Sequence, residues 1–170
     1  MKQLMGFVML QLAAALFAYQ RITEAKHQTD ALRSFGEMLD HLRGLLESDG
    51  SPMPALLETL LKCCCGEAEQ FVSSLHAEMD HLGQLPFREL WRRALSENTP
   101  ALEEEAKQEL DALGSVLGRY DLKTQMDSID ACRRILRQRL EERQNMQMQD
   151  TRVTLGLSLS ASLLLGILLI

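Results

Sequence analysis

Residues 121–155, DLKTQMDSIDACRRILRQRLEERQNMQMQDTRVTL, contain neither glycine nor proline, and their apolar side chains recur every three or four positions. The members of this stripe are Leu122, Met126, Ile129, Cys132, Leu136 and Leu140. Such spacing places the side chains on one face of an α-helix. Asp121 stands just before the stripe, where its carboxylate can accept hydrogen bonds from the first free backbone N–H groups. The sequence therefore predicts one long helix that begins after Asp121 and continues unbroken toward the end of the chain.

The rest of the chain is also predicted to be helical. A second stripe, in which we place Ile22, Ala25, Leu32, Phe35, Leu39, Leu42 and Leu46, predicts a first long helix that ends near Glu47 at the breaker Ser48–Pro52. Between the long helices we expect four short ones: Pro54–Cys65, ended by Gly66; Glu67–Leu82, ended by Gly83; Pro86–Asn98; and a fifth helix capped by Thr99, begun by Pro100 and closed by Gly118. Signals for strands are nearly absent. We therefore predict an all-α six-helix bundle, with its first and last helices side by side.

Both ends of the chain carry an uncharged apolar run. Residues 153–170, VTLGLSLSASLLLGILLI, would extend ~27 Å as a helix, close to the hydrocarbon thickness of a bilayer. Residues 4–19, LMGFVMLQLAAALFAY, form a shorter run that contains Gln11. We predict a transmembrane helix at each end, which divides the chain into residues 1–21, a helical domain at 22–152, and residues 153–170.

The first apolar run has a second interpretation. Lys2, the apolar stretch and the small residues near Ala15–Ala18 also suit a secretory signal peptide. A cleaved signal would leave an extracytoplasmic helical scaffold anchored at its C-terminal end. We favour the uncleaved helix, because no glycine or proline occurs between Phe7 and Phe35 and the helical pattern runs through the cleavage region.

Charge supports a cytoplasmic domain that does not bind nucleic acid. The stretch from Glu24 to Asp150 holds all 24 acidic residues of the chain but only 15 of its 18 Lys and Arg, a net charge of −9. Nucleic-acid binding requires a basic face instead. Basic residues near the spans gather on the domain side, which the positive-inside rule places in the cytoplasm. These residues are Arg21, Lys26, Arg33, Arg137, Arg139, Arg143 and Arg152, against Lys2 on the other side.

The sequence contains no constellation typical of catalysis, and we expect no enzyme activity, metal or cofactor. His76 and His81 are five residues apart, whereas a helical zinc pair needs a spacing of four, so a metal-dependent enzyme using this segment ranks last. Cys63, Cys64 and Cys65 are adjacent, so they point in different directions from a helix. Four cysteines in this arrangement do not form a disulfide scaffold.

One basic and aromatic cluster is a candidate docking surface. Arg88, Arg92 and Arg93 surround Trp91 on a short helix, and arginine and tryptophan are enriched where proteins bind one another. We expect Trp91 itself to be a core residue. The three arginines are the candidate contacts for a partner.

A more specific motif stands at the predicted corner before the last helix. Residues 113–129, LGSVLGRYDLKTQMDSI, follow the pattern LG..LG..D...Q...I, with Gly114, Gly118, Asp121 and Gln125 at its marked positions. A glycine-to-proline turn precedes two earlier helices, at 50–54 and 83–86. This order, with a membrane helix at each end of about 170 residues, resembles the stage III sporulation protein AB family of spore-forming bacteria over essentially the whole chain.

The resemblance implies a function. The family looks like a reduced form of the membrane-platform proteins of type II secretion and type IV pilus systems, whose cytoplasmic domain is a six-helix bundle. It implies a place in the channel complex between mother cell and forespore, in the mother-cell membrane around the forespore. It also implies the partner ATPase, stage III sporulation protein AA, and other stage III channel proteins. Secretion platforms carry two bundles and more membrane helices, so this chain would need self-association to build a platform. Within the motif, we expect Asp121 to cap the helix and Gln125 to satisfy backbone groups at the corner; the alternative is that both belong to the docking surface for the ATPase.

Overall fold

We analysed a computed structural model of the chain, which describes the backbone of residues 2–49 and 52–168 and the side chains of residues 19–20, 22–48 and 52–146. The described residues form six α-helices, one short 3₁₀ helix and no strand. The helices are α1 (Lys2–Asp49), α2 (Met53–Leu61), α3 (Gly66–Glu78), η1 (Met79–His81), α4 (Phe87–Asn98), α5 (Glu104–Gly114) and α6 (Leu122–Leu168). The prediction of an all-α fold with six helices is confirmed.

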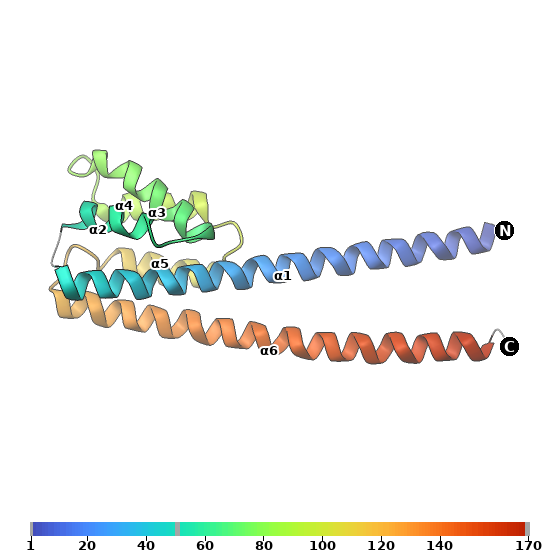
Figure 1. Cartoon of the computed structure of the whole chain (residues 1–170). Coiled ribbons are helices and arrows are strands. Elements are labelled where there is room, and N and C mark those ends of the chain that lie inside the picture. Colours follow the sequence, from blue (N-terminus) through green and yellow to red (C-terminus); the bar gives the residue numbers. More distant parts are fainter. Residues whose placement is uncertain (1, 50–51, 169–170) are drawn as a thin grey trace.

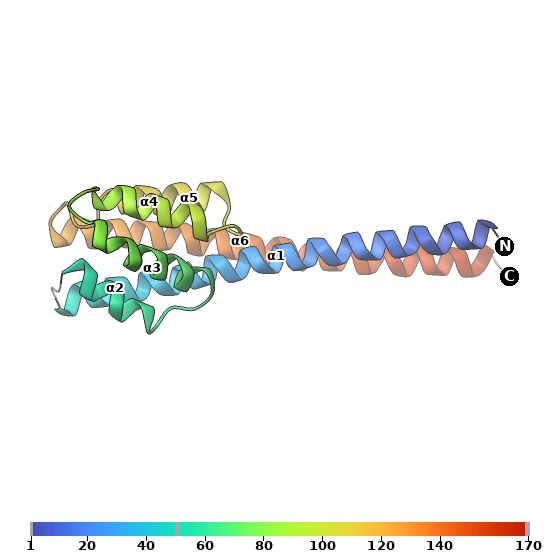
Figure 2. The ribbon, with the colours of Figure 1, turned by 90° about the horizontal axis from the view of Figure 1, so that it is seen from above.

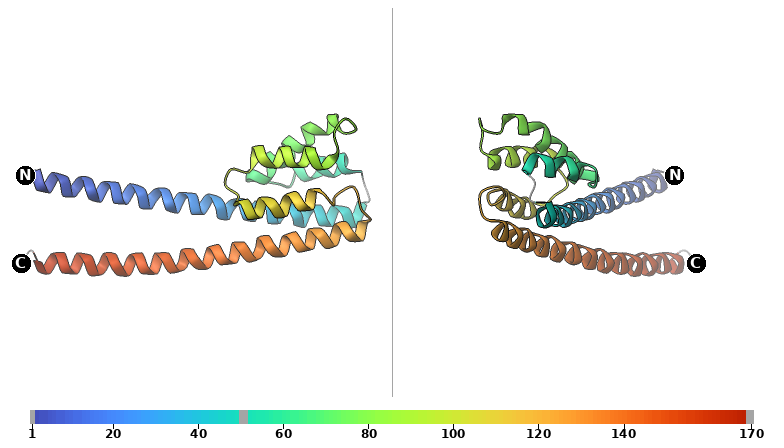
Figure 3. Two further views of the ribbon diagram at one scale, coloured as in Figure 1. Left: turned by 180° about the vertical axis from the view of Figure 1, so that it is seen from behind. Right: turned by 60° about the vertical axis from the view of Figure 1, so that its left-hand side comes forward.

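The two long helices determine the shape of the molecule. α1 and α6 run side by side in opposite directions; α2, α3 and α5 pack on them near one end, and α4 packs on α3 and α5 (Figure 1). The start of α1 and the end of α6 both lie at the other end, as the views in Figure 2 and Figure 3 show. The turn between α5 and α6 lies at the end of the bundle farthest from them (Figure 1). The prediction of two adjacent, unbroken long helices is therefore correct.

Ion pairs between the long helices define their register. Nε of Arg43 donates to the Asp130 carboxylate at 3.1 Å, and Arg133 pairs with Asp40. Because the helices are antiparallel, moving one residue forward along α1 leads to a position opposite the preceding residue of α6. Continued along both helices, this register places residues 5–19 at the same level as residues 154–168.

The core lies between the long helices and α2–α5. Phe35, Leu39 and Leu42 of α1 are almost fully buried, as are Ile129 and Leu136 of α6. The first residue of each predicted apolar stripe is not part of the core: Ile22 is 69% exposed and Leu122 is 46% exposed. Ile22 lies before the first buried residue of α1, and Leu122 is the first residue of α6, so the small helices do not cover either side chain.

The start of the fifth helix differs from the prediction. Thr99 ends α4 instead of capping α5: its hydroxyl donates to the Leu95 carbonyl at 2.6 Å. Pro100 lies in a turn, and α5 begins at Glu104 after Leu102 has entered the core. A buried threonine hydroxyl needs a partner, and the free carbonyl at the end of α4 supplies it.

Other predicted boundaries also shift. α2 ends at Leu61, so Cys63–Cys65 lie in a turn and not in a helix, and Gly66 (φ +64°) is the first residue of α3. α3 ends at Glu78 and is followed by η1, instead of reaching Leu82. α5 ends at Gly114, and turns separate it from Gly118. The fourth helix has its predicted limits, with Pro86 as N-cap and Asn98 as the last residue.

Where side chains are described, no helix has a stretch long and apolar enough to cross a membrane. The predicted spans Leu4–Tyr19 and Val153–Ile170 fall almost wholly outside those residues, so the two spans remain predictions.

Candidate functional site

The three arginines of α4 are already paired within the bundle. Nε of Arg92 lies 3.2 Å from Asp111 of α5, and Arg88 reaches the same carboxylate at 3.9 Å. Arg93 lies 3.3 Å from Glu78 at the end of α3. These side chains are about half exposed, so each pair contributes little to stability. The pairs nevertheless offset the charge that would attract an acidic partner, and a docking role for Arg88, Arg92 and Arg93 remains a prediction.

Trp91 belongs to the core, as predicted. It is 2% exposed, and its ring packs edge-on against Phe71 with centroids 4.8 Å apart. Its indole Nε1 donates to the Leu110 carbonyl at 2.8 Å, which satisfies the one polar group that burial would otherwise leave unpaired. Trp91 therefore joins α4 to α3 and α5 and is not available to a partner.

The two glycines of the LG..LG motif, Gly114 and Gly118, are needed for different physical reasons. Gly114 is buried in the last turn of α5, directly against the Trp91 ring, where a Cβ atom would collide with the indole. Gly118 has open space around it but adopts φ +72°, a left-handed conformation that L-residues with a Cβ atom rarely take. The first glycine allows close packing, and the second allows the chain to turn toward α6.

Two polar side chains hold the corner after Gly118. Oε1 of Gln125 accepts from the Gly118 N–H at 3.1 Å, and its Nε2 donates to the Tyr120 carbonyl at 2.7 Å. The Asp121 carboxylate accepts from the Thr124 N–H at 3.1 Å and from the Thr124 hydroxyl at 2.7 Å. These are the bonds that a helix cap and a backbone clamp require. The hydrogen bonds from Thr124 lower the pKa of Asp121.

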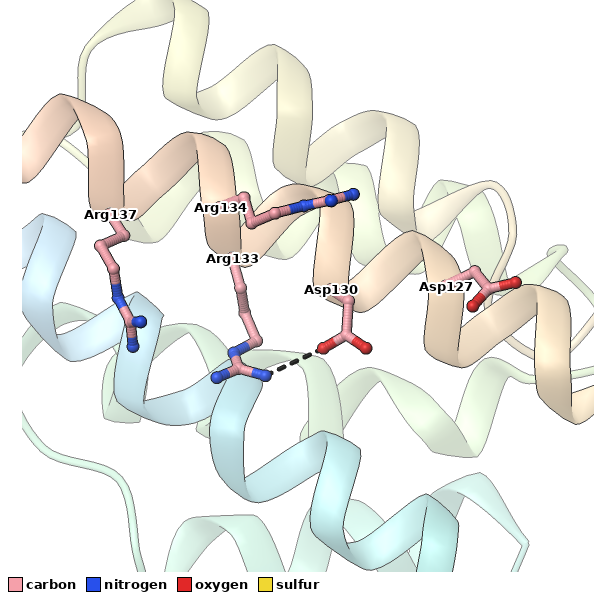
Figure 4. Close-up of a pocket in the computed structure, with 5 residues that line it drawn as sticks. All are labelled: Asp127, Asp130, Arg133, Arg134 and Arg137. Atoms are coloured by element: carbon pink, nitrogen blue, oxygen red, sulfur yellow. Dashed lines mark hydrogen bonds and ion pairs between the residues drawn. The ribbon is translucent and has the colours of Figure 1, made fainter.

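The face shared by α1 and α6 carries a charged network. Figure 4 shows Asp127, Asp130, Arg133, Arg134 and Arg137 along α6, with Arg133 and Arg137 directed toward α1 and a dashed line from Arg133 to Asp130. Spacing along one helix predicts the pair of Arg133 with Asp130, at 2.9 Å. It does not predict Arg43 or Asp40, because these residues come from a different helix.

Asp130 is the centre of this network. Partial desolvation raises the pKa of its carboxyl, but hydrogen bonds and charges from Arg43 and Arg133 outweigh that effect, and the pKa of Asp130 is lowered overall. Arg134 and Arg137 lie beside Asp130 and Arg133 on α6, and neither forms a salt bridge with any described residue. The network ties α1 to α6.

A second connection joins the loop before α5 to α6 and to α3. Glu103 is 17% exposed and pairs with Arg139 and Arg143 of α6. Oε1 of Glu67 accepts from the Ala101 N–H at 3.1 Å, and burial raises the pKa of Glu67 against the opposing effect of that bond. Glu103 therefore has specific partners on α6 and is not simply a solvated acid at the start of a helix.

The described residues contain no group of three His, Cys, Asp or Glu placed to hold a metal ion. The cysteines are free thiols: Cys63 and Cys65 are exposed, Cys64 is half-buried and Cys132 is buried. Burial raises the pKa of Cys64 to about 11 and that of Cys132 to about 12.

Comparisons with known proteins agree with the motif. The sequence model of the family described as stage III sporulation protein AB matches residues 3–170. A search by sequence among curated proteins gave no match. A solved structure titled "Stage III sporulation protein AB (SpoIIIAB)" superposes with a TM-score of 0.65 at 16% sequence identity, over 72% of this chain and 98% of that one, which supports the fold. Because the family model covers nearly the whole sequence, the chain belongs to the stage III sporulation protein AB family of sporulation proteins.

Proposed function

We propose that this protein is a non-enzymatic membrane-platform component of the channel complex between mother cell and forespore. In this proposal two transmembrane helices hold the bundle on the cytoplasmic side of the mother-cell membrane around the forespore. The bundle couples a cytoplasmic ATPase of the stage III sporulation protein AA type to the membrane assembly. Self-association and contacts with other stage III channel proteins would complete the platform.

The register of α1 and α6 carries the proposal. Arg43 faces Asp130, and Asp40 faces Arg133, so residues 5–19 and 154–168 come to the same level. These residues make up most of the two uncharged runs of the sequence, 4–19 and 153–170. One bilayer could therefore contain both runs, at the end of the molecule opposite the bundle corners (Figure 1).

The long helices are suited to transmit movement. Both continue as single helices from the bundle past its last buried residue, and neither has a glycine or proline between the bundle and the predicted span. Sharp kinks in helices usually arise at such residues. The ion pairs of Asp130 and Asp40 tie the two helices together inside the bundle. A force applied to α2–α5 would thus move both helices as a unit.

The unbroken course of α1 also bears on the rival interpretation. Cleavage of a signal peptide near Ala15–Ala18 would cut the chain within α1, which runs from Lys2 to Asp49. Amino-terminal sequencing of the protein from sporulating cells distinguishes the two. Retention of residues 1–21 supports the transmembrane helix, and a mature chain that begins near Tyr19 would favour the extracytoplasmic scaffold.

The central experiment measures binding between the full chain in lipid nanodiscs and the purified partner ATPase. We expect saturable binding whose affinity changes between ATP-bound and ADP-bound enzyme, because coupling requires different affinities for two states. Empty nanodiscs serve as the control. If a folded, membrane-inserted chain shows no binding in any nucleotide state, the coupling role is wrong.

A further inference from the structure

Exposed apolar side chains gather at the corner between α5 and α6. Tyr120 is 51% exposed and Leu122 is 46% exposed, and they lie two residues apart. They are two of the six large apolar side chains that are strongly exposed among the described residues, and Tyr120 also supplies the carbonyl that Gln125 binds. Exposed apolar side chains that gather in one place often mark a contact with another protein.

Two cations flank these side chains. Arg119 and Lys123 are exposed, and neither forms a salt bridge with another described residue. The Arg119 guanidinium lies 5.8 Å from the centroid of the Tyr120 ring. The α4 arginines differ, because Asp111 and Glu78 already pair with them. Arg119 and Lys123 carry two positive charges and Asp121 between them carries one negative charge, so residues 119–123 keep a net charge of +1 in a protein whose formal net charge is −6.

The backbone beneath these side chains is held in place. Gln125 clamps it on both sides, at the Gly118 N–H and the Tyr120 carbonyl, and the Asp121 carboxylate is engaged by Thr124. A surface that is already ordered loses less conformational entropy when it binds. Arginine and tyrosine are also the residues on which binding energy concentrates most often.

We propose that Arg119, Tyr120, Leu122 and Lys123, here named the corner patch, dock an acidic protein surface that contains an apolar hollow. The proposal deepens the proposed function and rests on it: the occupant is a surface of the cytoplasmic ATPase. The corner patch lies at the end of the bundle farthest from the chain termini (Figure 1), where a cytoplasmic partner reaches it without meeting the bilayer.

The test compares two double charge reversals in the full chain in nanodiscs, with the purified ATPase as the probe. Arg119→Glu with Lys123→Glu alters the corner patch. Lys26→Glu with Arg134→Glu makes the same change in net charge at two exposed cations elsewhere, which also lack salt bridges with described residues. We expect the corner variant to bind at least about 30-fold more weakly and the control to bind within about 2-fold of wild type. Circular dichroism and thermal melting confirm that both variants are folded.

A third variant separates a shaped contact from simple charge attraction. Tyr120→Ser with Leu122→Ser keeps both cations, and we expect it to weaken binding even at high salt, where attraction between exposed charges is screened. If wild type binds the ATPase and the corner and control variants bind it equally well, the proposal that the corner patch docks the ATPase is wrong. The proposed function would still stand. If wild type itself does not bind, both proposals fall. If the corner variant binds the ATPase as wild type does but forms oligomers of a different mass, the patch is a contact between copies of this chain. That result would overturn the assignment of the patch to the ATPase.

Discussion

Gly114 lies directly against the indole ring of Trp91. A Cβ atom added to Gly114 would stand 2.6 Å from Nε1 of Trp91 and nearer still to two carbons of the ring. The indole is held in place, because its N–H is bonded to the Leu110 carbonyl and its ring packs edge-on against Phe71. The absence of a side chain at Gly114 is therefore what allows α5 to pack against α4.

Gly114→Ala should destabilise the bundle. The added methyl group overpacks a site where the neighbour has no free movement, and we expect a loss of about 1–3 kcal/mol in the free energy of unfolding. Denaturant unfolding followed by Trp91 fluorescence measures it. Gly36→Ala is the matched control, because a Cβ atom at Gly36 meets nothing within 4 Å and alanine is the better helix former by about 0.5–1 kcal/mol. Equal effects of the two substitutions would contradict the packing argument.

Gly118 should be sensitive to conformation instead of volume. Gly118→Ala forces a left-handed backbone on a residue with a Cβ atom, at a cost of about 1–2 kcal/mol, although the site has open space. Gly118→Asn should cost less, because asparagine tolerates this conformation better. Melting temperatures of the two variants test the order. If alanine is tolerated better than asparagine, backbone strain is not the cause.

Asp130 should make stability depend on pH. Its pKa is lower in the folded chain than in the unfolded one, so its ion pairs contribute fully above about pH 4, near the ordinary value of an aspartate. That contribution is lost as pH falls through the lowered pKa. Asp130→Asn should reduce the melting temperature at pH 7 by roughly 2–4 °C. The difference from wild type should shrink in melts at pH 3, and a constant difference would contradict this assignment.

The four thiols should react at very different rates. Cys63 and Cys65 are exposed, while burial raises the pKa of Cys132 to about 12 and keeps that thiol protonated and enclosed. Brief treatment with iodoacetamide at pH 8, followed by peptide mass spectrometry, should show Cys63 and Cys65 alkylated and Cys132 unmodified. Cys64, with a pKa of about 11, should react more slowly than its neighbours. In denaturant all four should react, and early modification of Cys132 in the folded chain would contradict its burial.

Glu103 should stabilise the contact between the start of α5 and α6. Glu103→Ala leaves Arg139 and Arg143 without their partner, and we expect a loss of about 1–3 kcal/mol. Glu104→Ala is the control, because the adjacent acid is exposed and forms no salt bridge with a described residue, so its loss should stay within about 0.5 kcal/mol. Denaturant unfolding of both variants measures the difference. A Glu103 variant as stable as the control would show that the ion pairs contribute nothing.

The sequence predicted those features that depend on neighbouring residues. Unbroken helical spacing gave α1 and α6, Pro86 gave the start of α4, and Asp121 gave the start of α6. The expected core position of Trp91 is also confirmed. Backbone preference and helical period act over a few residues, so one sequence suffices to infer them.

The Thr99 prediction was wrong for a tertiary reason. Threonine before proline is a common helix start, but Leu102 enters the core and Glu67 binds the Ala101 N–H, so α5 begins four residues after Pro100. Local preference for a cap was overridden by burial of an apolar side chain and by a partner from another helix.

By itself, then, the sequence determined the helical class, the long first and last helices and the cap at Asp121. Only the tertiary structure decided which side chains meet across long separations: Gly114 with Trp91, Glu103 with Arg139 and Arg143, and Asp130 with Arg43. The same packing pairs the α4 arginines and leaves Arg119 and Lys123 without a salt-bridge partner among the described residues. The physical reason is range: helical periodicity is a local property of the chain, whereas a contact between helices depends on which faces are buried together and in what register.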